Sequence, residues 1–267
     1  MRLACCQLDI AWEDKAANYR RVESLLAAAQ LAPGTLVLLP EMFATGFTMN
    51  AEAAAESIDG PTAEFLADLA RRNRLWVQAG VVLREEDVPR PRNEALVFSH
   101  EGRLAARYAK MHLFSFAGEP EHYAPGESPV LFSWSGGSVA PAICYDLRFP
   151  EFFRGAAAGG AEILTVIACW PAAREEHWLT LARARAIENQ CYVGAVNRCG
   201  AEPSGTAYSG RSQIIDPRGA ILADAGSEEG VIQAEIDLDE LRRYRQEFPA
   251  LRDAHPNPPS PSGRGLG

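Results

Sequence analysis

A cysteine, a glutamate and a lysine each stand directly behind an apolar or mixed stretch of the sequence, and together they have the chemistry for nucleophilic catalysis. Cys144 follows GSVAPAI, Glu41 follows TLVLLP and Lys110 follows RLAARYA. Each stretch predicts a strand, so three strands could bring the three side chains to one end of one sheet. A thiol, a carboxylate base and an ammonium group placed there could cleave an acyl compound.

Cys144 is the expected nucleophile. It lies where a predicted strand ends and a helix begins, and the free N–H groups of a helix N-terminus favour thiolate over thiol. We therefore expect its pKa to lie below the ordinary value of about 8.5. The alternative is that Cys144 is a small buried hydrophobic residue, as free cysteines often are.

Lys110 stands out because lysine is rare in this chain. Of the 26 basic residues, Lys15 and Lys110 are the two lysines, and the rest are arginines. Arginine cannot simply replace a compact ammonium group in a tight pocket. This usage favours a specific role for Lys110 over that of an ordinary surface lysine.

Three segments of the sequence resemble the Glu-Lys-Cys motifs of the nitrilase superfamily, carbon–nitrogen hydrolases that act on amides and nitriles. They are LPE, which ends with Glu41, YAKMHLF around Lys110, and CYDLRFPE, which begins with Cys144. The resemblance extends over nearly the whole chain. It implies a single hydrolase domain, residues 1–255, with the four-layer α-β-β-α sandwich of that superfamily.

The resemblance also implies a division of the chemistry. Cys144 attacks the carbonyl carbon to form a thioester, and Glu41 acts as the general base. Lys110 and the backbone N–H of Tyr145 hold the negatively charged oxygen of the tetrahedral intermediate. Acyl transfer to a thiol needs no cofactor, so we expect none, and no metal site.

A second glutamate of the superfamily lies in the segment SFAGEPEHYAPG, residues 115–126. Its spacing to Pro125-Gly126 favours Glu119, which would orient Lys110 or assist the proton transfers. Glu121 is the alternative. Without the resemblance, both would be ordinary solvated acids of a loop.

The segments CYDLRFPE, ACWPAAREEHW and ARAIENQCYV are most similar to the omega-amidase branch of the superfamily. That resemblance implies hydrolysis of the terminal amide of 2-oxoglutaramate or 2-oxosuccinamate to a dicarboxylate and ammonia. Such substrates carry a carboxylate, and Arg148 is the nearest cation after the nucleophile. The alternative for Arg148 is an ion pair with Asp146 or Glu151. Further candidates for the pocket wall are Phe47, His112, Tyr123, Tyr145, Trp170 and Arg174.

Other functions stay open at this point. An amidase for deaminated glutathione or an N-carbamoyl amine is the alternative within the superfamily, and it would need a wider pocket. A catalytically inactive binding module is the alternative outside enzymes, although the intact Glu, Lys and Cys set argues against it. The sequence has no HExxH, GxxxxGK or GxSxG motif, which disfavours metalloprotease, P-loop and serine hydrolase chemistry.

Composition indicates a small-molecule partner. Acidic residues outnumber basic ones, 35 to 26, and no basic run suggests a nucleic-acid surface. No apolar run reaches the roughly 20 residues of a membrane span, and no signal-peptide pattern is present, so we expect a cytoplasmic protein without membrane contact. The six cysteines are too scattered for a disulfide scaffold, and most of them are expected to be reduced core residues. A homodimer is expected by resemblance.

Apolar runs alternate with amphipathic segments, which predicts a layered α/β domain. Helices are predicted at residues 12–30, 60–73, 150–158, 175–189 and 237–246, and strands at 2–10, 35–40, 75–83, 93–99, 103–109, 137–143, 162–168, 191–197, 210–215, 220–223 and 231–236. The last four strands suggest a second, antiparallel portion. Residues 115–126 are expected to form a loop, and the polar tail 256–267 is expected to be disordered.

Overall fold

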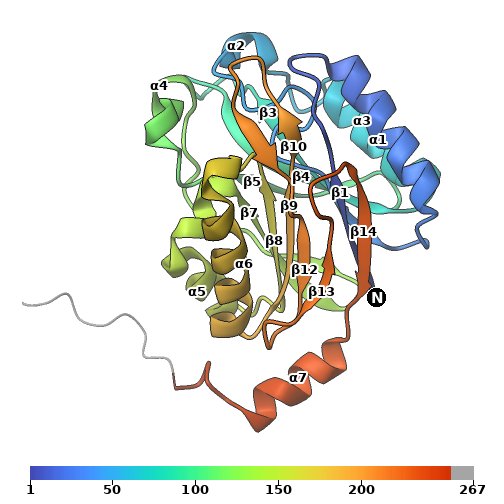
Figure 1. Ribbon diagram of the computed structural model, residues 1–267, viewed down its shortest axis with the longest axis vertical. Helices are drawn as coiled ribbons and strands as arrows, with labels where there is room; N and C mark the ends of the chain where they lie inside the picture. Colours follow the sequence, from blue (N-terminus) through green and yellow to red (C-terminus); the bar gives the residue numbers. More distant parts are fainter. Residues whose placement is uncertain (254–267) are drawn as a thin grey trace, which may run out of the picture.

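The computed structural model describes residues 1–253 of the chain, and the tail at residues 256–267 lies outside this range. Two six-stranded sheets pack against each other, and helices cover the outer face of each (Figure 1). The predicted four-layer α-β-β-α sandwich is confirmed.

The first sheet contains both the first and the last strand of the described chain. Its order is β14 (Gly230–Glu235), β1 (Arg2–Gln7), β2 (Leu36–Leu38), β3 (Trp76–Leu83), β4 (Arg92–Phe98) and β5 (Leu104–Ala109). β1, β2 and β3 run parallel, and the strands outside them pair antiparallel. Glu41 follows β2 and Lys110 follows β5, so this sheet supplies two of the predicted site residues.

The second sheet has the same plan, with a parallel centre and antiparallel edges. Its order is β13 (Ile221–Asp224), β12 (Gln213–Ile215), β9 (Tyr192–Asn197), β8 (Ile163–Ala168), β7 (Gly137–Ile143) and β6 (Phe132–Trp134). Cys144 follows β7, and Cys169 follows β8. A separate hairpin joins β10 (Cys199–Ala201) to β11 (Ala207–Ser209).

The central strands are buried on both faces, which explains their near-continuous apolar runs. In β1, Leu3 and Cys5 belong to the core that includes the second sheet, whereas Ala4 and Cys6 belong to the core under the helices. The sheets approach closely at Gly194 of β9. A Cβ atom there would lie 2.7 Å from Leu3 Cδ2, so the missing side chain makes room for the facing sheet.

Four helices form the outer layers. α1 (Lys15–Ala29) and α3 (Pro61–Asn73) cover the first sheet, and α5 (Pro150–Ala158) and α6 (Glu175–Asn189) cover the second (Figure 1). α1 begins where the Asp14 side chain accepts a hydrogen bond of 2.9 Å from the Ala17 N–H. The remaining helices are α2 (Ala51–Ala54), α4 (Glu119–His122), α7 (Leu238–Glu247) and the short 3-10 helices η1 (Ser115–Ala117), η2 (Cys144–Arg148) and η3 (Ala172–Arg174).

Two predictions about elements are wrong. The last four strands do not form a separate antiparallel portion, because β9, β12 and β13 complete the second sheet while β14 pairs with β1 in the first. Residues 115–126 are not a plain loop, because η1 and α4 lie within them. Both helices are too short to produce a helical period in the sequence.

Two further observations concern the chain as a whole. All six cysteines are buried and unpaired, whereas the sequence predicted this for most of them. None of the helices within residues 1–253 combines the length and the apolar composition that a bilayer crossing needs.

Candidate active site

Glu41, Lys110 and Cys144 meet between the two sheets, and not at the end of one sheet as the sequence suggested. Glu41 and Lys110 follow strands of the first sheet, whereas Cys144 follows a strand of the second. All three side chains are buried. The site therefore depends on the face-to-face packing of the sheets.

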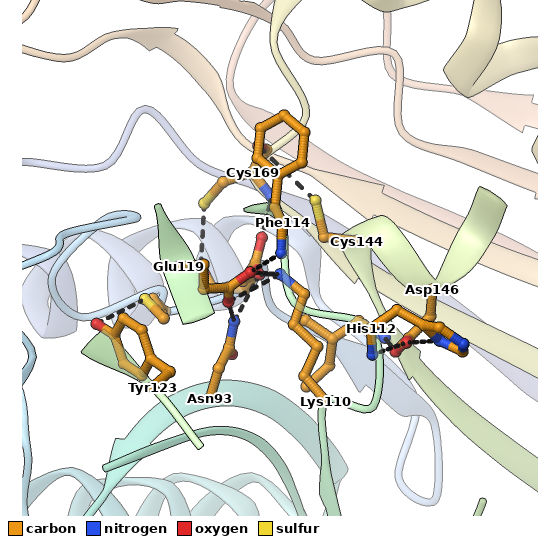
Figure 2. A network of polar contacts seen from close by, with 12 residues as sticks. Asn93, Lys110, His112, Phe114, Glu119, Tyr123, Cys144, Asp146 and Cys169 are labelled. Carbon is orange, nitrogen blue, oxygen red and sulfur yellow. Dashed lines mark hydrogen bonds and ion pairs between the residues drawn. The ribbon is translucent and has the colours of Figure 1, made fainter. Parts of the chain in front are cut away.

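The ammonium group of Lys110 lies between two carboxylates. Its Nζ is 2.8 Å from Glu41 Oε1, and 3.0 and 2.9 Å from Oε1 and Oε2 of Glu119 (Figure 2). Glu119 is buried and Glu121 is exposed, so Glu119 is the acid that reaches the site. Burial alone would lower the pKa of Lys110, but the charges of Glu119 and Glu41 outweigh it and raise that pKa well above its ordinary value. Lys110 is therefore charged throughout the neutral range.

Three hydrogen-bond donors hold the Glu41 carboxylate, and close packing against β3 holds the Glu41 backbone. Its Oε1 accepts hydrogen bonds from Lys110 and from Asn93 Nδ2 at 2.7 Å. Its Oε2 accepts one from the backbone N–H of Cys169 at 2.9 Å. The chain at Glu41 also lies directly against β3, where a Cβ atom on Gly80 would be 2.5 Å from Glu41 Cα. Glycine at that position lets the segment after β2 approach its neighbour.

Cys144 occupies a strained turn between β7 and η2. Its φ of 46° lies in the left-handed region that residues other than glycine rarely adopt. Such a conformation persists where neighbours hold it, and Asp146 does so here. Oδ2 of Asp146 accepts hydrogen bonds from the Ile143 N–H (2.9 Å) and the Tyr108 hydroxyl (2.7 Å). Its Oδ1 accepts one from the His112 N–H (3.0 Å).

The expected low pKa of Cys144 is wrong. Burial first and the neighbouring Glu41 carboxylate second raise the pKa of the thiol well above its ordinary value, and the Lys110 ammonium group opposes them only in part. Lys110 already faces two carboxylates, so a thiolate would be a third anion beside one cation. The five-residue helix that begins at Cys144 does not compensate. The resting side chain is a neutral thiol near a carboxylate that can take its proton.

Cys144 forms part of the wall of a cavity of about 300 Å³. Of the residues predicted for the substrate pocket, five line it, namely Phe47, Tyr145, Arg148, Trp170 and Arg174. Tyr123 does not, because it is buried and its hydroxyl donates to the Thr48 carbonyl oxygen at 2.6 Å. His112 does not line it either. The His112 ring stacks on Phe149 with 3.8 Å between centroids, and its Nδ1 lies 2.8 Å from Asp146 Oδ1. His112 therefore supports the turn under the nucleophile instead of contacting the cavity.

Arg148 and Arg174 both line the cavity, and neither has a carboxylate partner within residues 1–253. The guanidinium group of Arg148 lies 4.8 Å from the centroid of the Trp170 ring and 3.1 Å from His177 Nδ1. That of Arg174 lies 5.1 Å from the centroid of the Phe116 ring. The ion pairs considered for Arg148 are not formed in the described part of the chain, so its charge is available to an anion.

A family comparison agrees with this geometry. Residues 2–246 match the family model described as carbon-nitrogen hydrolase. The chain belongs to the carbon–nitrogen hydrolase family. The resemblance in the three motifs is confirmed by this match.

Relatives of this carbon–nitrogen hydrolase resemble it over almost their whole length. An omega-amidase from Yersinia enterocolitica is 37% identical over 254 residues, which cover 95% of this chain and 96% of that protein. A 2-oxoglutaramate amidase from Bacillus subtilis is 36% identical, with 94% and 96% covered. A solved structure of a superfamily member from Xanthomonas campestris, with an arsenic adduct in its active site, has a TM-score of 0.90 at 35% identity and covers 97% of this chain and 99% of that chain.

Two parts of the hydrolase site escape sequence reasoning. Asn93 is buried and donates hydrogen bonds to both Glu41 and Glu119. The hairpin of β10 and β11 supplies another part of the cavity wall, where the Tyr208 hydroxyl donates to Glu202 Oε2 at 3.0 Å. An asparagine near the start of a strand and a short polar hairpin form no pattern that predicts a site. The one available signal was that Asn93 directly follows a long polar connection.

Proposed function

We propose that this carbon–nitrogen hydrolase is an omega-amidase, which releases ammonia from the terminal amide of a small 2-oxo dicarboxylic acid monoamide such as 2-oxoglutaramate or 2-oxosuccinamate. The observation that supports it most is the thiol of Cys144, which lines a cavity and has the buried Glu41 carboxylate and Lys110 ammonium group behind it. The same cavity presents two arginines without carboxylate partners in residues 1–253. The relatives from Yersinia enterocolitica and Bacillus subtilis favour the same substrate class.

In the first half of the proposed reaction, Cys144 attacks the amide carbon while its proton passes to Glu41. The new carbon–sulfur bond turns the carbonyl oxygen into an oxyanion. When the tetrahedral intermediate collapses, the carbon–nitrogen bond breaks and Glu41 returns the proton to the leaving nitrogen, which departs as ammonia. An acyl thioester on Cys144 remains.

In the second half, water attacks the thioester and gives a proton to Glu41. The second tetrahedral intermediate collapses with loss of the sulfur, which recovers the proton, and the carboxylic acid product leaves. No further group is needed, because Glu41 alternates between base and acid in both halves.

Lys110 acts mainly through its charge. An ammonium group has three N–H donors, and three carboxylate oxygens lie within 3.0 Å of Lys110 Nζ. A direct hydrogen bond to the oxyanion would require one bond to Glu119 to open. The backbone N–H of Tyr145, which directly follows the nucleophile, supplies a second donor to the same oxygen.

The cavity favours a small substrate. Its volume of about 300 Å³ is at the lower end of the ~300–1,000 Å³ found for ligand cavities. Arg148 would bind the substrate carboxylate, because a guanidinium group matches the two oxygens of that anion. Deaminated glutathione is a larger amide and is the competing substrate in the test.

The decisive experiment measures ammonia release from a panel of amides. The panel contains 2-oxoglutaramate, 2-oxosuccinamate, glutamine, deaminated glutathione, an N-carbamoyl amine and a simple nitrile. We expect the highest kcat/KM for the two 2-oxo monoamides. A higher kcat/KM for deaminated glutathione would replace the proposal by the related amidase, and no turnover of any compound would favour a binding module.

The nucleophile is tested with Cys144→Ala, which should abolish ammonia release and leave the fold intact because little buried volume changes. Cys191→Ala is the matched control. Cys191 is also a buried free thiol, but its Sγ contacts the backbone of Ala161 and Asn189 and does not line the cavity. A Cys144→Ala enzyme with near-normal turnover would exclude the mechanism.

The carboxylate site is tested with Arg148→Ala. Loss of a charged hydrogen bond to the substrate should raise KM for 2-oxoglutaramate by about tenfold or more, with a smaller effect on kcat. Arg84→Ala is the charge control, because Arg84 forms an exposed ion pair with Glu52. An unchanged KM in Arg148→Ala would show that another group, such as Arg174, binds the carboxylate.

We also propose a cytoplasmic homodimer, as is common in the superfamily. The half-exposed side chain of Ile187 on the outer helix α6 offers an apolar contact of the kind found in such interfaces. Sedimentation at micromolar concentration would measure the oligomeric state.

A further inference from the structure

Asn93 contacts both carboxylates of the site. Its Nδ2 lies 2.7 Å from Glu41 Oε1 and 3.0 Å from Glu119 Oε1. The side chain is fully buried in β4, and Figure 2 shows its amide end directed at Glu119 and Lys110. One amide nitrogen thus supplies two N–H groups to two different anions.

The orientation of this amide follows from the charges around it. Turning the group over would place Oδ1 against two carboxylates, which repel an acceptor. In the observed orientation Oδ1 is buried and has no hydrogen-bond partner within residues 1–253. The side chain of Asn93 serves the two carboxylates alone.

The backbone of Asn93 also fixes the third charged group. Its carbonyl oxygen accepts a hydrogen bond of 2.9 Å from the Lys110 N–H, at the point where the chain leaves β5. Asn93 itself pairs with Val82 of β3, so its position is set by the sheet. One residue therefore locates the lysine through its backbone and both acids through its side chain.

Two carboxylates facing one ammonium group repel each other, so further donors are needed to hold both in place. The titratable groups that face this cluster are Lys110, Glu119, the thiols of Cys144 and Cys169, and the hydroxyl of Tyr123. Among them only Lys110 is a cation, so the anions also depend on neutral donors. The backbone N–H groups of Cys169 and Phe114 each contact one carboxylate, whereas Asn93 contacts both.

We propose that Asn93 is a positioning residue that keeps the Glu41 carboxylate beside Lys110 and directed toward Cys144. The inference deepens the proposed function, on which its catalytic consequence rests. Asn93 itself touches neither the substrate cavity nor the reacting sulfur and acts through the two glutamates.

Asn93→Asp tests the proposal, because it keeps the shape of the side chain and replaces the donor by an oxygen. A third carboxylate beside one ammonium group should bind a proton in the neutral range. We expect the acid limb of the kcat/KM profile to move up by about one pH unit or more. At neutral pH, kcat should fall at least about tenfold while KM stays within about twofold, since the arginines of the cavity are unchanged.

A second readout does not depend on the identity of the amide. The rate of alkylation of Cys144 by iodoacetamide should also shift to higher pH in Asn93→Asp, because added negative charge makes the thiolate less favourable. Asn93→Ser, which keeps one hydroxyl donor and adds no charge, should shift both profiles in the same direction by less. This variant takes the place of Asn93→Asp should the aspartate destabilise the fold.

Asn189→Asp is the matched control. Asn189 resembles Asn93 in being buried and in having an Oδ1 without a partner in the described residues. Its Nδ2 donates to the Arg185 carbonyl oxygen at 3.0 Å. Asn189 lies on α6, however, and does not line the cavity. It should leave both profiles unchanged. A shifted alkylation profile in an enzyme that hydrolyses none of the amides would refute the omega-amidase and retain the role of Asn93. Profiles of Asn93→Asp that coincide with wild type, or shifts that Asn189→Asp reproduces, would overturn the role of Asn93.

Discussion

Because the Cys144 thiol is neutral at rest, the proposed mechanism needs Glu41 to take the thiol proton. Burial and the Glu41 carboxylate raise the pKa of the thiol, so little thiolate exists before substrate binds. In the proposed mechanism, the proton therefore passes to Glu41 as the sulfur attacks. The carboxylate that disfavours the free thiolate is then the group that accepts its proton.

We expect Glu41→Gln to separate hydrolysis from alkylation. The variant loses the base and the proton donor of the leaving nitrogen, so kcat for ammonia release should fall by about 10²–10⁴. Removal of a negative charge beside the sulfur should make the thiolate easier to form, so iodoacetamide should still alkylate Cys144. Ammonia assays and mass spectrometry of the labelled protein measure the two effects.

Glu121→Gln provides the control for this change, because Glu121 is an exposed acid close in sequence to Glu119. It should behave as wild type in both assays. Glu41→Gln with near-normal hydrolysis would exclude Glu41 as the base, and a complete loss of alkylation would show that the sulfur needs Glu41 in every reaction.

At this scale the sequence predicted which residues meet but not their protonation. Glu41, Lys110 and Cys144 each follow an apolar or mixed stretch that predicts a strand, and the spacing to Pro125-Gly126 favoured Glu119, which is buried. The pKa of the thiol depends on its burial and on charged groups that follow strands of both sheets, so no single sequence motif predicts it. The same holds for Asn93, whose contacts arise only when the sheets are in place.

Among the elements, the turn between β7 and η2 is the part whose geometry most affects the sulfur. Tyr108 holds this turn from the other sheet, because its hydroxyl donates to Asp146 and accepts from the Met111 N–H at 3.2 Å. The left-handed conformation of Cys144 relies on such contacts.

Tyr108→Phe should therefore affect both stability and rate. Loss of one buried hydroxyl between two partners should lower the free energy of unfolding by about 1–3 kcal/mol. A looser turn should also reduce kcat severalfold. Urea denaturation and ammonia release at saturating substrate measure the two effects.

Tyr192→Phe is the comparison for this variant, since the Tyr192 hydroxyl donates to the Asp237 carbonyl oxygen at 3.3 Å and does not line the cavity. It should lose some stability with an unchanged kcat. Equal effects of the two variants on kcat would contradict a special role for the turn at Cys144.

The sequence predicts the regular elements well and their partners poorly. Strands and long helices leave an apolar run or a helical period, so α5 and α6 have the bounds that the sequence predicts, residues 150–158 and 175–189. The sequence of a strand does not show which other strand it pairs with. The apolar pattern of β14 is compatible with either sheet, and only the three-dimensional structure shows that it pairs with β1.

For the whole molecule, the buried cysteines link stability to alkaline pH. Burial, only partly offset by Arg245, raises the pKa of Cys191 to about 12. The thiol keeps its proton in the folded chain, whereas the unfolded chain releases it near pH ~8.5. Its contribution to stability is therefore complete below pH ~8.5 and is lost progressively between that value and its folded pKa.

We expect the free energy of unfolding to fall from about pH 8.5 upward, by up to ~1.4 kcal/mol per pH unit for each such thiol. Cys191→Ala should show a smaller loss between pH ~7.5 and ~9.5, by about 1 kcal/mol. Urea denaturation under reducing conditions at both pH values measures the difference. A wild-type enzyme and a Cys191→Ala variant with the same pH dependence would contradict the link to this thiol.

The placement of the sulfur on one sheet and of the base on the other has a consequence for heat inactivation. Neither sheet alone holds a working set of groups, so a small separation of the two layers stops turnover while each layer still keeps its own hydrogen-bonded strands. On warming, activity should therefore be lost at a lower temperature than the helical circular-dichroism signal, because activity depends on the interface between the two sheets.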